Sequence, residues 1–187
     1  IPSAYSHQVH NLSIGPDDML YVNVGDGFVS TAAPDVNDLR GKVLRMHKDG
    51  SLPNDNPFED TYIYAKAFRN PFGGAWRDSD DTFYLSDNGP KEDDRLVKVL
   101  PGEDYGWGEP YDLTVGAIYL WNPVVSPVGI DFVEETLFPA EYHGHLFVAR
   151  SGPTYAQGQN TAGKRIQRFE LDADGNVVTE EQFMNYT

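Results

Sequence analysis

The chain has 187 residues, enough for a domain with a substantial core, and its 29 acidic and 14 basic residues give a formal net charge of −15. A surface of this charge repels nucleic acids and anionic membranes, and no run of about 18 apolar residues predicts a membrane span. The chain has no cysteine, which excludes disulfides and thiolate metal sites.

A triplet of an apolar, an aromatic and an apolar residue recurs at equal intervals along the chain, beginning at Leu20, Phe83 and Leu146. Each triplet lies between two further strand-like runs, which are 11–14 and 42–46, 73–76 and 95–100, and 128–132 and 165–171. Turns rich in Gly and Asp follow these runs, and no long stretch has a helical period. The pattern predicts an all-β fold.

Repeats of three or four short strands, each unable to bury its own face, predict the blades of a β-propeller. The approximate repeats are 7–69, 70–126 and 127–187, so residues 1–187 are expected to form one partial propeller. A β-sandwich whose strands happen to align is the alternative. Three blades leave sheet edges open, so we expect about half of a six-bladed ring. The remaining blades would come from the same gene product, from another chain or from further copies of this one.

Several segments are similar, in order and spacing, to motifs of the glucose/sorbosone dehydrogenases, the soluble quinoproteins that oxidise aldose sugars. These segments are His7-Gln8, 12–17, 39–45, Phe68-Arg69-Asn70-Pro71, Asn88-Gly89-Pro90, Tyr105-Gly106-Trp107 and Phe138-Pro139-Ala140. The resemblance implies a six-bladed propeller that holds pyrroloquinoline quinone (PQQ) and Ca²⁺ on its axis. It also implies a sugar or similar alcohol as substrate, an external electron acceptor, and a periplasmic or extracellular location. A nicotinamide cofactor is not indicated, because no Gly-x-Gly-x-x-Gly follows a predicted strand.

The resemblance gives His7 the role of catalytic base, and an imidazole can take up a proton near neutral pH. Relatives often carry Asp directly before this histidine, where Ser6 stands here, so an orienting carboxylate must come from elsewhere. Arg69 and Asn70 match a pair that touches the quinone, one through its permanent charge and one through its amide. The alternative is a surface turn. Phe72 stands where relatives often carry Gln, which removes one polar contact.

The resemblance also implies that the backbone carbonyls of Gly89 and Pro90 hold the catalytic Ca²⁺, since this ion prefers hard oxygen donors. The alternative is a simple turn after a strand. A lysine that completes the cofactor pocket in the family is not in register here, and Arg150 or Lys164 is expected to substitute for it. Some relatives bind a second Ca²⁺ near the segment 93–95, which we expect here to be a solvated loop without metal.

The sequence therefore predicts a PQQ- and Ca²⁺-dependent sugar dehydrogenase in which His7 takes a proton while hydride passes to the quinone. The replacements Ser6 and Phe72 favour an alternative, a non-catalytic propeller module that binds carbohydrate or protein. A Ca²⁺-dependent hydrolase has the least support. Catalysis requires His7, Arg69 and the carbonyls of 89–90 to share one axial cavity, which is a geometric test.

Overall fold

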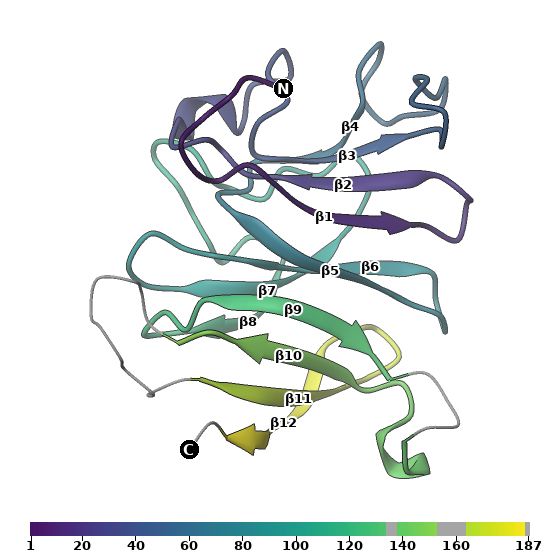
Figure 1. Ribbon diagram of the computed structural model, residues 1–187, viewed down its shortest axis with the longest axis vertical. Helices are drawn as coiled ribbons and strands as arrows, with labels where there is room; N and C mark the ends of the chain where they lie inside the picture. The colour runs from purple at the N-terminus through teal and green to yellow at the C-terminus, as the bar shows by residue number, and fades with distance from the viewer. Residues whose placement is uncertain (134–137, 153–163, 186–187) are drawn as a thin grey trace.

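The computed structural model describes residues 1–133, 138–152 and 164–185. Over these ranges twelve strands form three antiparallel four-stranded sheets, which follow one another along the long axis of the molecule (Figure 1). The expectation of an all-β chain is confirmed. The helical residues of these ranges form only the short 3-10 helices η1 (Ser30–Ala32) and η2 (Ala140–Tyr142), and no helix there could cross a bilayer.

Each sheet is a meander in which strands adjacent in sequence are hydrogen-bonded. The first sheet contains β1 (Val9–Ile14), β2 (Leu20–Val24), β3 (Lys42–Met46) and β4 (Ile63–Lys66). The second contains β5 (Pro71–Arg77), β6 (Thr82–Asp87), β7 (Asp94–Val99) and β8 (Ala117–Trp121). The third contains β9 (Pro127–Phe132), β10 (Leu146–Arg150), β11 (Arg165–Leu171) and β12 (Val177–Asn185).

The recurring apolar triplet is explained by sheets that are buried on both faces. Successive side chains of a strand point to opposite faces, so a strand covered on both sides has no need of alternating polar residues. In β6, Phe83 and Leu85 join the core between the first and second sheets, whereas Tyr84 joins the core between the second and third. The second sheet is thus packed on both faces.

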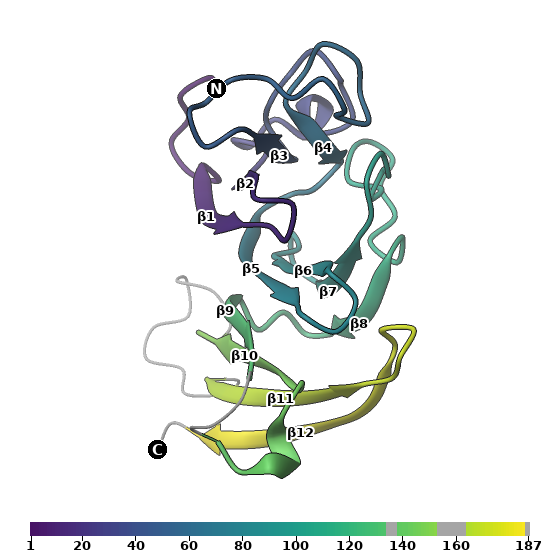
Figure 2. The same ribbon diagram turned by 90° about the vertical axis from the view of Figure 1, so that its right-hand side faces the viewer.

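The first strands of the sheets, β1, β5 and β9, are neighbours in space, because β5 packs against both of the others (Figure 2). In each sheet, antiparallel pairing puts the start of the first strand beside the end of the second. The residue pairs at this end are Val9–Val24, Pro71–Asp87 and Pro127–Arg150. Residues that precede β1, β5 and β9, or follow β2, β6 and β10, are therefore brought toward a common region.

The loop between β7 and β8 crosses back to the end of the first sheet. The backbone N–H of Tyr105 donates to Lys66 O at 2.9 Å, and that of Trp107 donates to Ala67 O at 3.0 Å. An isolated parallel bridge between Lys66 and Asp104 adds to this connection. The loop fastens the first and second sheets together on the side where Trp107 lies.

Candidate active site

A cavity of about 540 Å³ lies where the ends of the three sheets meet. The sequence-predicted residues that line it are His7, Arg69, Asn70, Gly89 and Pro90. They come from the segments before β1 and β5 and after β6, as the strand pairing requires. The structure thus brings the predicted base, the predicted cation and the predicted carbonyl pair to one place, which we call the axial cavity.

His7 is held by a carboxylate that the sequence analysis did not identify. The Nδ1–H of His7 donates to Asp26 Oδ1 at 2.6 Å, and both side chains are buried. Asp26 lies two residues after the end of β2, so the hairpin of β1 and β2 places it opposite a residue that precedes β1. The orienting group that Ser6 cannot supply therefore comes from the other end of the same hairpin.

Asp26 accepts two further hydrogen bonds, from the Phe28 backbone N–H at 2.9 Å and from the Trp107 indole N–H at 2.8 Å. Burial raises the pKa of Asp26, but the hydrogen bonds from His7, Phe28 and Trp107 outweigh burial and hold that pKa below its usual value. The group stays a carboxylate, which keeps the proton of His7 on Nδ1. Among the described residues nothing is hydrogen-bonded to Nε2, so its lone pair is left to accept a proton.

The backbone at His7 has an unusual conformation, with φ of +54° in the left-handed region. The Gly27 N–H donates to His7 O at 3.2 Å, and a side chain at Gly25 would come within 2.6 Å of the same oxygen. The imidazole packs against the Phe28 ring, with 4.0 Å between the centroids. A glycine at position 25 is thus required for His7 to approach the hairpin this closely.

Arg69 is a half-buried cation that is fixed by carbonyl groups and an aromatic ring. Its Nη1 donates to Asn88 O and Gly89 O, both at 2.8 Å, and its guanidinium lies 5.7 Å from the Trp107 ring centroid. Burial lowers the pKa of Arg69, with partial compensation from nearby carboxylates such as Asp26, and an arginine stays charged under such conditions. Trp107 therefore touches the groups that hold the base and the group that supplies positive charge.

Asn70 is positioned through both its backbone and its side chain. Its backbone N–H donates to Asp87 Oδ1 at 2.7 Å, and its Oδ1 accepts a hydrogen bond from His10 Nε2 at 2.7 Å. The His10 ring stacks on Phe72 with 4.1 Å between centroids, and burial lowers the pKa of this histidine. With Oδ1 occupied, the Asn70 Nδ2 donor is the part of the amide left for a ligand.

The loop of Gly89 and Pro90 is tied to the third sheet by Asp94. This carboxylate accepts from the backbone N–H groups of Gly89 at 2.7 Å, Val125 at 2.6 Å and Ser126 at 2.7 Å. Burial raises the pKa of Asp94, and these three donors oppose that effect. The expectation of a solvated loop over 93–95 is wrong for Asp94 and Arg95, which are 1% and 0% exposed.

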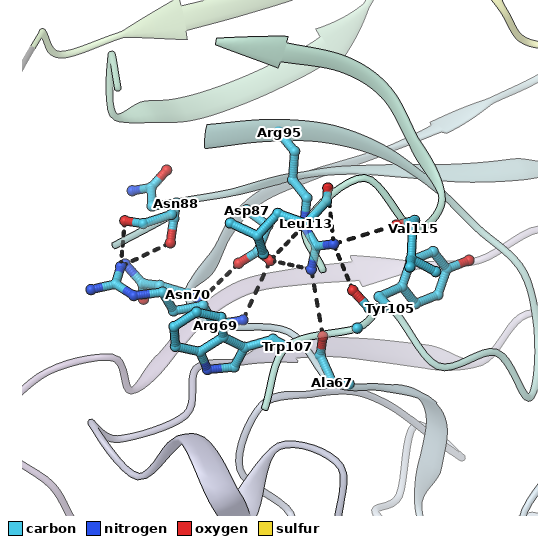
Figure 3. A network of polar contacts seen from close by, with 12 residues as sticks. Ala67, Arg69, Asn70, Asp87, Asn88, Arg95, Tyr105, Trp107, Leu113 and Val115 are labelled. Atoms are coloured by element: carbon cyan, nitrogen blue, oxygen red, sulfur yellow. Dashed lines mark hydrogen bonds and ion pairs between the residues drawn. The ribbon is translucent and has the colours of Figure 1, made fainter. Parts of the chain in front are cut away.

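Arg95 and Asp87 form a buried ion pair within the polar network that includes Arg69 and Asn70 (Figure 3). They are direct partners across β6 and β7, and Arg95 Nη2 lies 2.7 Å from Asp87 Oδ2. Arg95 Nε also donates to Asp87 Oδ2, at 3.0 Å, and the terminal nitrogens reach backbone carbonyls, of which the nearest is Tyr105 O at 2.6 Å. Because Asp87 also accepts from the backbone of Asn70, the pair supports the part of the site that carries Arg69 and Asn70.

Arg150 and Lys164, the cations expected to complete the cofactor pocket, do not line the axial cavity. Arg150 faces a second cavity of about 530 Å³ beside Trp121 and Gln167. Lys164 borders a further one of about 450 Å³, next to Arg150. The structure separates them from His7, although Ser151, the neighbour of Arg150, does reach the axial cavity.

Replacing Trp107 with phenylalanine is expected to raise the pKa of Asp26, because the carboxylate loses its indole donor while an aromatic face remains for Arg69. A carboxyl ¹³C NMR titration measures this pKa directly. The matched control is Trp121→Phe, which removes an indole donor to Gln167 at 2.8 Å and leaves Asp26 untouched. An unchanged Asp26 pKa in Trp107→Phe would contradict the assigned role of the indole.

The family model described as Glucose / Sorbosone dehydrogenase matches residues 2–187. Among curated relatives, quinoprotein glucose dehydrogenase B of Acinetobacter calcoaceticus is 33% identical over an alignment of 129 residues that covers 57% of this chain and 27% of that protein. Aldose sugar dehydrogenase YliI of Escherichia coli is 25% identical over an alignment of 184 residues that covers 86% of this chain and 48% of that protein. The chain spans about half or less of the length of these relatives.

The solved structures that this chain resembles are also sugar dehydrogenases. The PQQ-bound form of the aldose sugar dehydrogenase from Streptomyces coelicolor matches with a TM-score of 0.81 and 27% identity, over 99% of this chain and 51% of that one. A glucose dehydrogenase from Thermus thermophilus matches with a TM-score of 0.80 and 25% identity, over 100% of this chain and 55% of that one. The expected fold class, about three blades of a propeller of the quinoprotein glucose dehydrogenase type, is confirmed. The chain belongs to the glucose/sorbosone dehydrogenase family.

Proposed function

We propose that this chain provides the base, the cation and the metal-binding loop of a sugar dehydrogenase that uses PQQ and Ca²⁺. The substrate would be an aldose or a similar alcohol, and an external acceptor would take the electrons. The observation that carries the proposal is the shared axial cavity of His7, Arg69 and the Gly89-Pro90 loop. Oxidation of a hydroxyl needs a base, an electron acceptor and positive charge near that acceptor, and this chain offers the first and the last.

His7 has the geometry of a general base. Its Nδ1–H is engaged by Asp26, so Nε2 can accept the proton of a sugar hydroxyl that enters the axial cavity. The imidazolium that forms is then stabilised by the Asp26 carboxylate 2.6 Å away. Asp26 orients the ring and balances its charge without itself taking the proton.

The polar groups of the cavity fit a quinone that bears carboxylates. PQQ, when bound, supplies the acceptor for hydride. Arg69 forms no ion pair with any described carboxylate, so its charge is available to an anionic ligand. Asn70 presents its Nδ2 donor, since Oδ1 is bound to His10. Both groups would hold the ring and stabilise negative charge on it.

The carbonyls of Gly89 and Pro90 would hold Ca²⁺, with Gly89 O exchanging the hydrogen bond from Arg69 Nη1 for the ion. Among the described residues no three acidic or histidine side chains cluster around a potential metal position, so a site here depends on backbone oxygens. One side-chain oxygen of the same loop, Asn88 Oδ1, is buried without a hydrogen-bond partner. An unpaired buried oxygen is costly, and a cation beside it would remove that cost.

Addition of PQQ and Ca²⁺ to the protein tests the proposal. We expect a Ca²⁺-dependent change in quinone absorbance that a chelator reverses, followed by reduction of an artificial electron acceptor when aldoses are added. Arg69→Gln should weaken quinone binding, whereas Arg40→Gln, which breaks only the ion pair with Asp38, should not. Failure to bind the quinone would refute the proposal. Carbohydrate binding with no acceptor reduction would instead support a non-catalytic binding module.

A further inference from the structure

Three arginines of this chain have no carboxylate partner among the described residues. Most arginines of this acidic chain form ion pairs, namely Arg40, Arg45, Arg77, Arg95 and Arg168. Among the described residues, Arg69, Arg150 and Arg165 form none. Arg69 lines the axial cavity, where an anion is expected. Arg150 and Arg165 lie side by side outside the axial cavity, and an anionic ligand could pair with them as well.

Arg150 and Arg165 are direct cross-strand partners at the paired ends of β10 and β11. Like charges that face each other across an antiparallel pair are destabilising. Burial lowers the pKa of Arg150, and the charge of Arg165 lowers it further. The Nε atom of each side chain is also buried without a hydrogen-bond partner. An anion between the two guanidinium groups would satisfy these donors and remove the repulsion.

Both arginines line the second cavity, of about 530 Å³. Its wall is fixed by Gln167, which is 3% exposed and accepts from Trp121 Nε1 and Arg150 Nη1, each at 2.8 Å. The Gln167 Nε2 donates to Glu180. Val124 is the only described residue that this cavity shares with the axial cavity. The second cavity is therefore a separate, prebuilt polar space.

The composition of the cavity selects the ligand. Guanidinium groups bind planar carboxylates in a bidentate manner. Two acidic residues also line the cavity. The charge of Glu180 acts on Arg150 and offsets one of the two positive charges, whereas Glu181 is paired with Arg168. This leaves a match for a single negative charge rather than for a phosphate dianion. Trp121, Gln167 and the volume suit a polar body of sugar size. We infer that Arg150 and Arg165 bind the carboxylate of a small hydroxylated organic acid, at a site distinct from the axial cavity.

Calorimetric titration with gluconate tests this inference, with glucose and inorganic phosphate as the comparison ligands. We expect gluconate to bind, and Arg165→Gln and Arg150→Gln each to weaken binding by about 10-fold or more, the usual effect of a lost charge-assisted hydrogen bond. Glucose, which lacks the carboxylate, should not bind at this site. Arg40→Gln, which breaks the ion pair with Asp38 away from this cavity, is the matched control and should retain gluconate affinity.

Thermal unfolding gives a second readout that does not depend on the axial cavity. Without ligand, Arg165→Gln should raise Tm, because it removes the repulsion, and gluconate should raise the Tm of the unmodified protein but not of this variant. No gluconate binding, equal binding of glucose or phosphate, or a Tm lowered by Arg165→Gln would overturn the inference. So would loss of gluconate binding in Arg69→Gln, or loss of PQQ binding in Arg165→Gln, because either would place the anion in the cofactor pocket.

Discussion

His7→Asn is expected to lower kcat for sugar oxidation by the PQQ-loaded protein by about 100- to 10,000-fold, the range that a general base contributes. The amide of asparagine cannot accept a proton at neutral pH, and the Asp26 carboxylate would have no imidazolium to stabilise. Quinone binding should change little, because Arg69 and the Gly89-Pro90 loop are untouched. Steady-state kinetics with an artificial electron acceptor, together with quinone titration, measure the two effects separately.

Asparagine is the appropriate replacement because His7 has a φ of +54°. Asparagine tolerates this left-handed conformation, whereas alanine would add backbone strain that could be mistaken for a catalytic effect. Asp26→Asn is the companion variant. Both Asp26 oxygens accept hydrogen bonds, and an amide must place an N–H group against one of these donors. Activity should fall and its pH profile should change. Full activity in His7→Asn would end the assignment of the base.

Arg95→Met is expected to lower the free energy of unfolding by about 3–5 kcal/mol, the usual cost of removing one partner of a buried ion pair. Arg95 is 0% and Asp87 1% exposed, so the variant leaves a carboxylate that water cannot reach. The carbonyls that accept from Arg95, including Tyr105 O, would also lose their donor. Urea unfolding monitored by tryptophan fluorescence measures the change.

The control for this prediction is Lys48→Met, which removes one partner of an exposed ion pair. Lys48 and Asp18 form an ion pair in which the side chains are 53% and 75% exposed, so its loss should change stability little. The double variant Arg95→Met with Asp87→Leu should recover only part of the lost stability, because Asp87 also accepts from the backbone of Asn70. Equal stabilities of Arg95→Met and Lys48→Met would show that the buried pair does not stabilise the fold.

Strands that are buried on both faces were predicted correctly from the sequence. The triplets at Leu20, Phe83 and Leu146 lie in β2, β6 and β10, where continuous apolar residues are required. Three or four strands were expected in each repeat, and the outer strands β4, β8 and β12 were not assigned to particular residues. β4 has only four residues, and most side chains of β12 are exposed, so neither carries a strong periodic signal. Their positions are set by pairing with the preceding strand.

The residues of the axial cavity were found through motifs, whereas their supports were missed because they are distant in sequence. Asp26 lies in a Gly-Asp-Gly segment that reads as a turn. The pairing of Val9 with Val24 nevertheless continues to residues 7 and 26, so the hairpin register contained the signal. Arg95 was interpreted as a solvated charge because its partner is identified only when β6 and β7 are aligned.

The position of Trp107 links the proposed base to the junction between two blades. The indole belongs to the loop after β7, yet it hydrogen-bonds the carboxylate at the end of β2 and covers the guanidinium before β5. A fluctuation that lifts this loop would withdraw the indole from Asp26 and Arg69 in a single event. The first blade on its own therefore holds a histidine and an aspartate but lacks the indole that hydrogen-bonds the aspartate, so the proposed acid–base role requires both blades together.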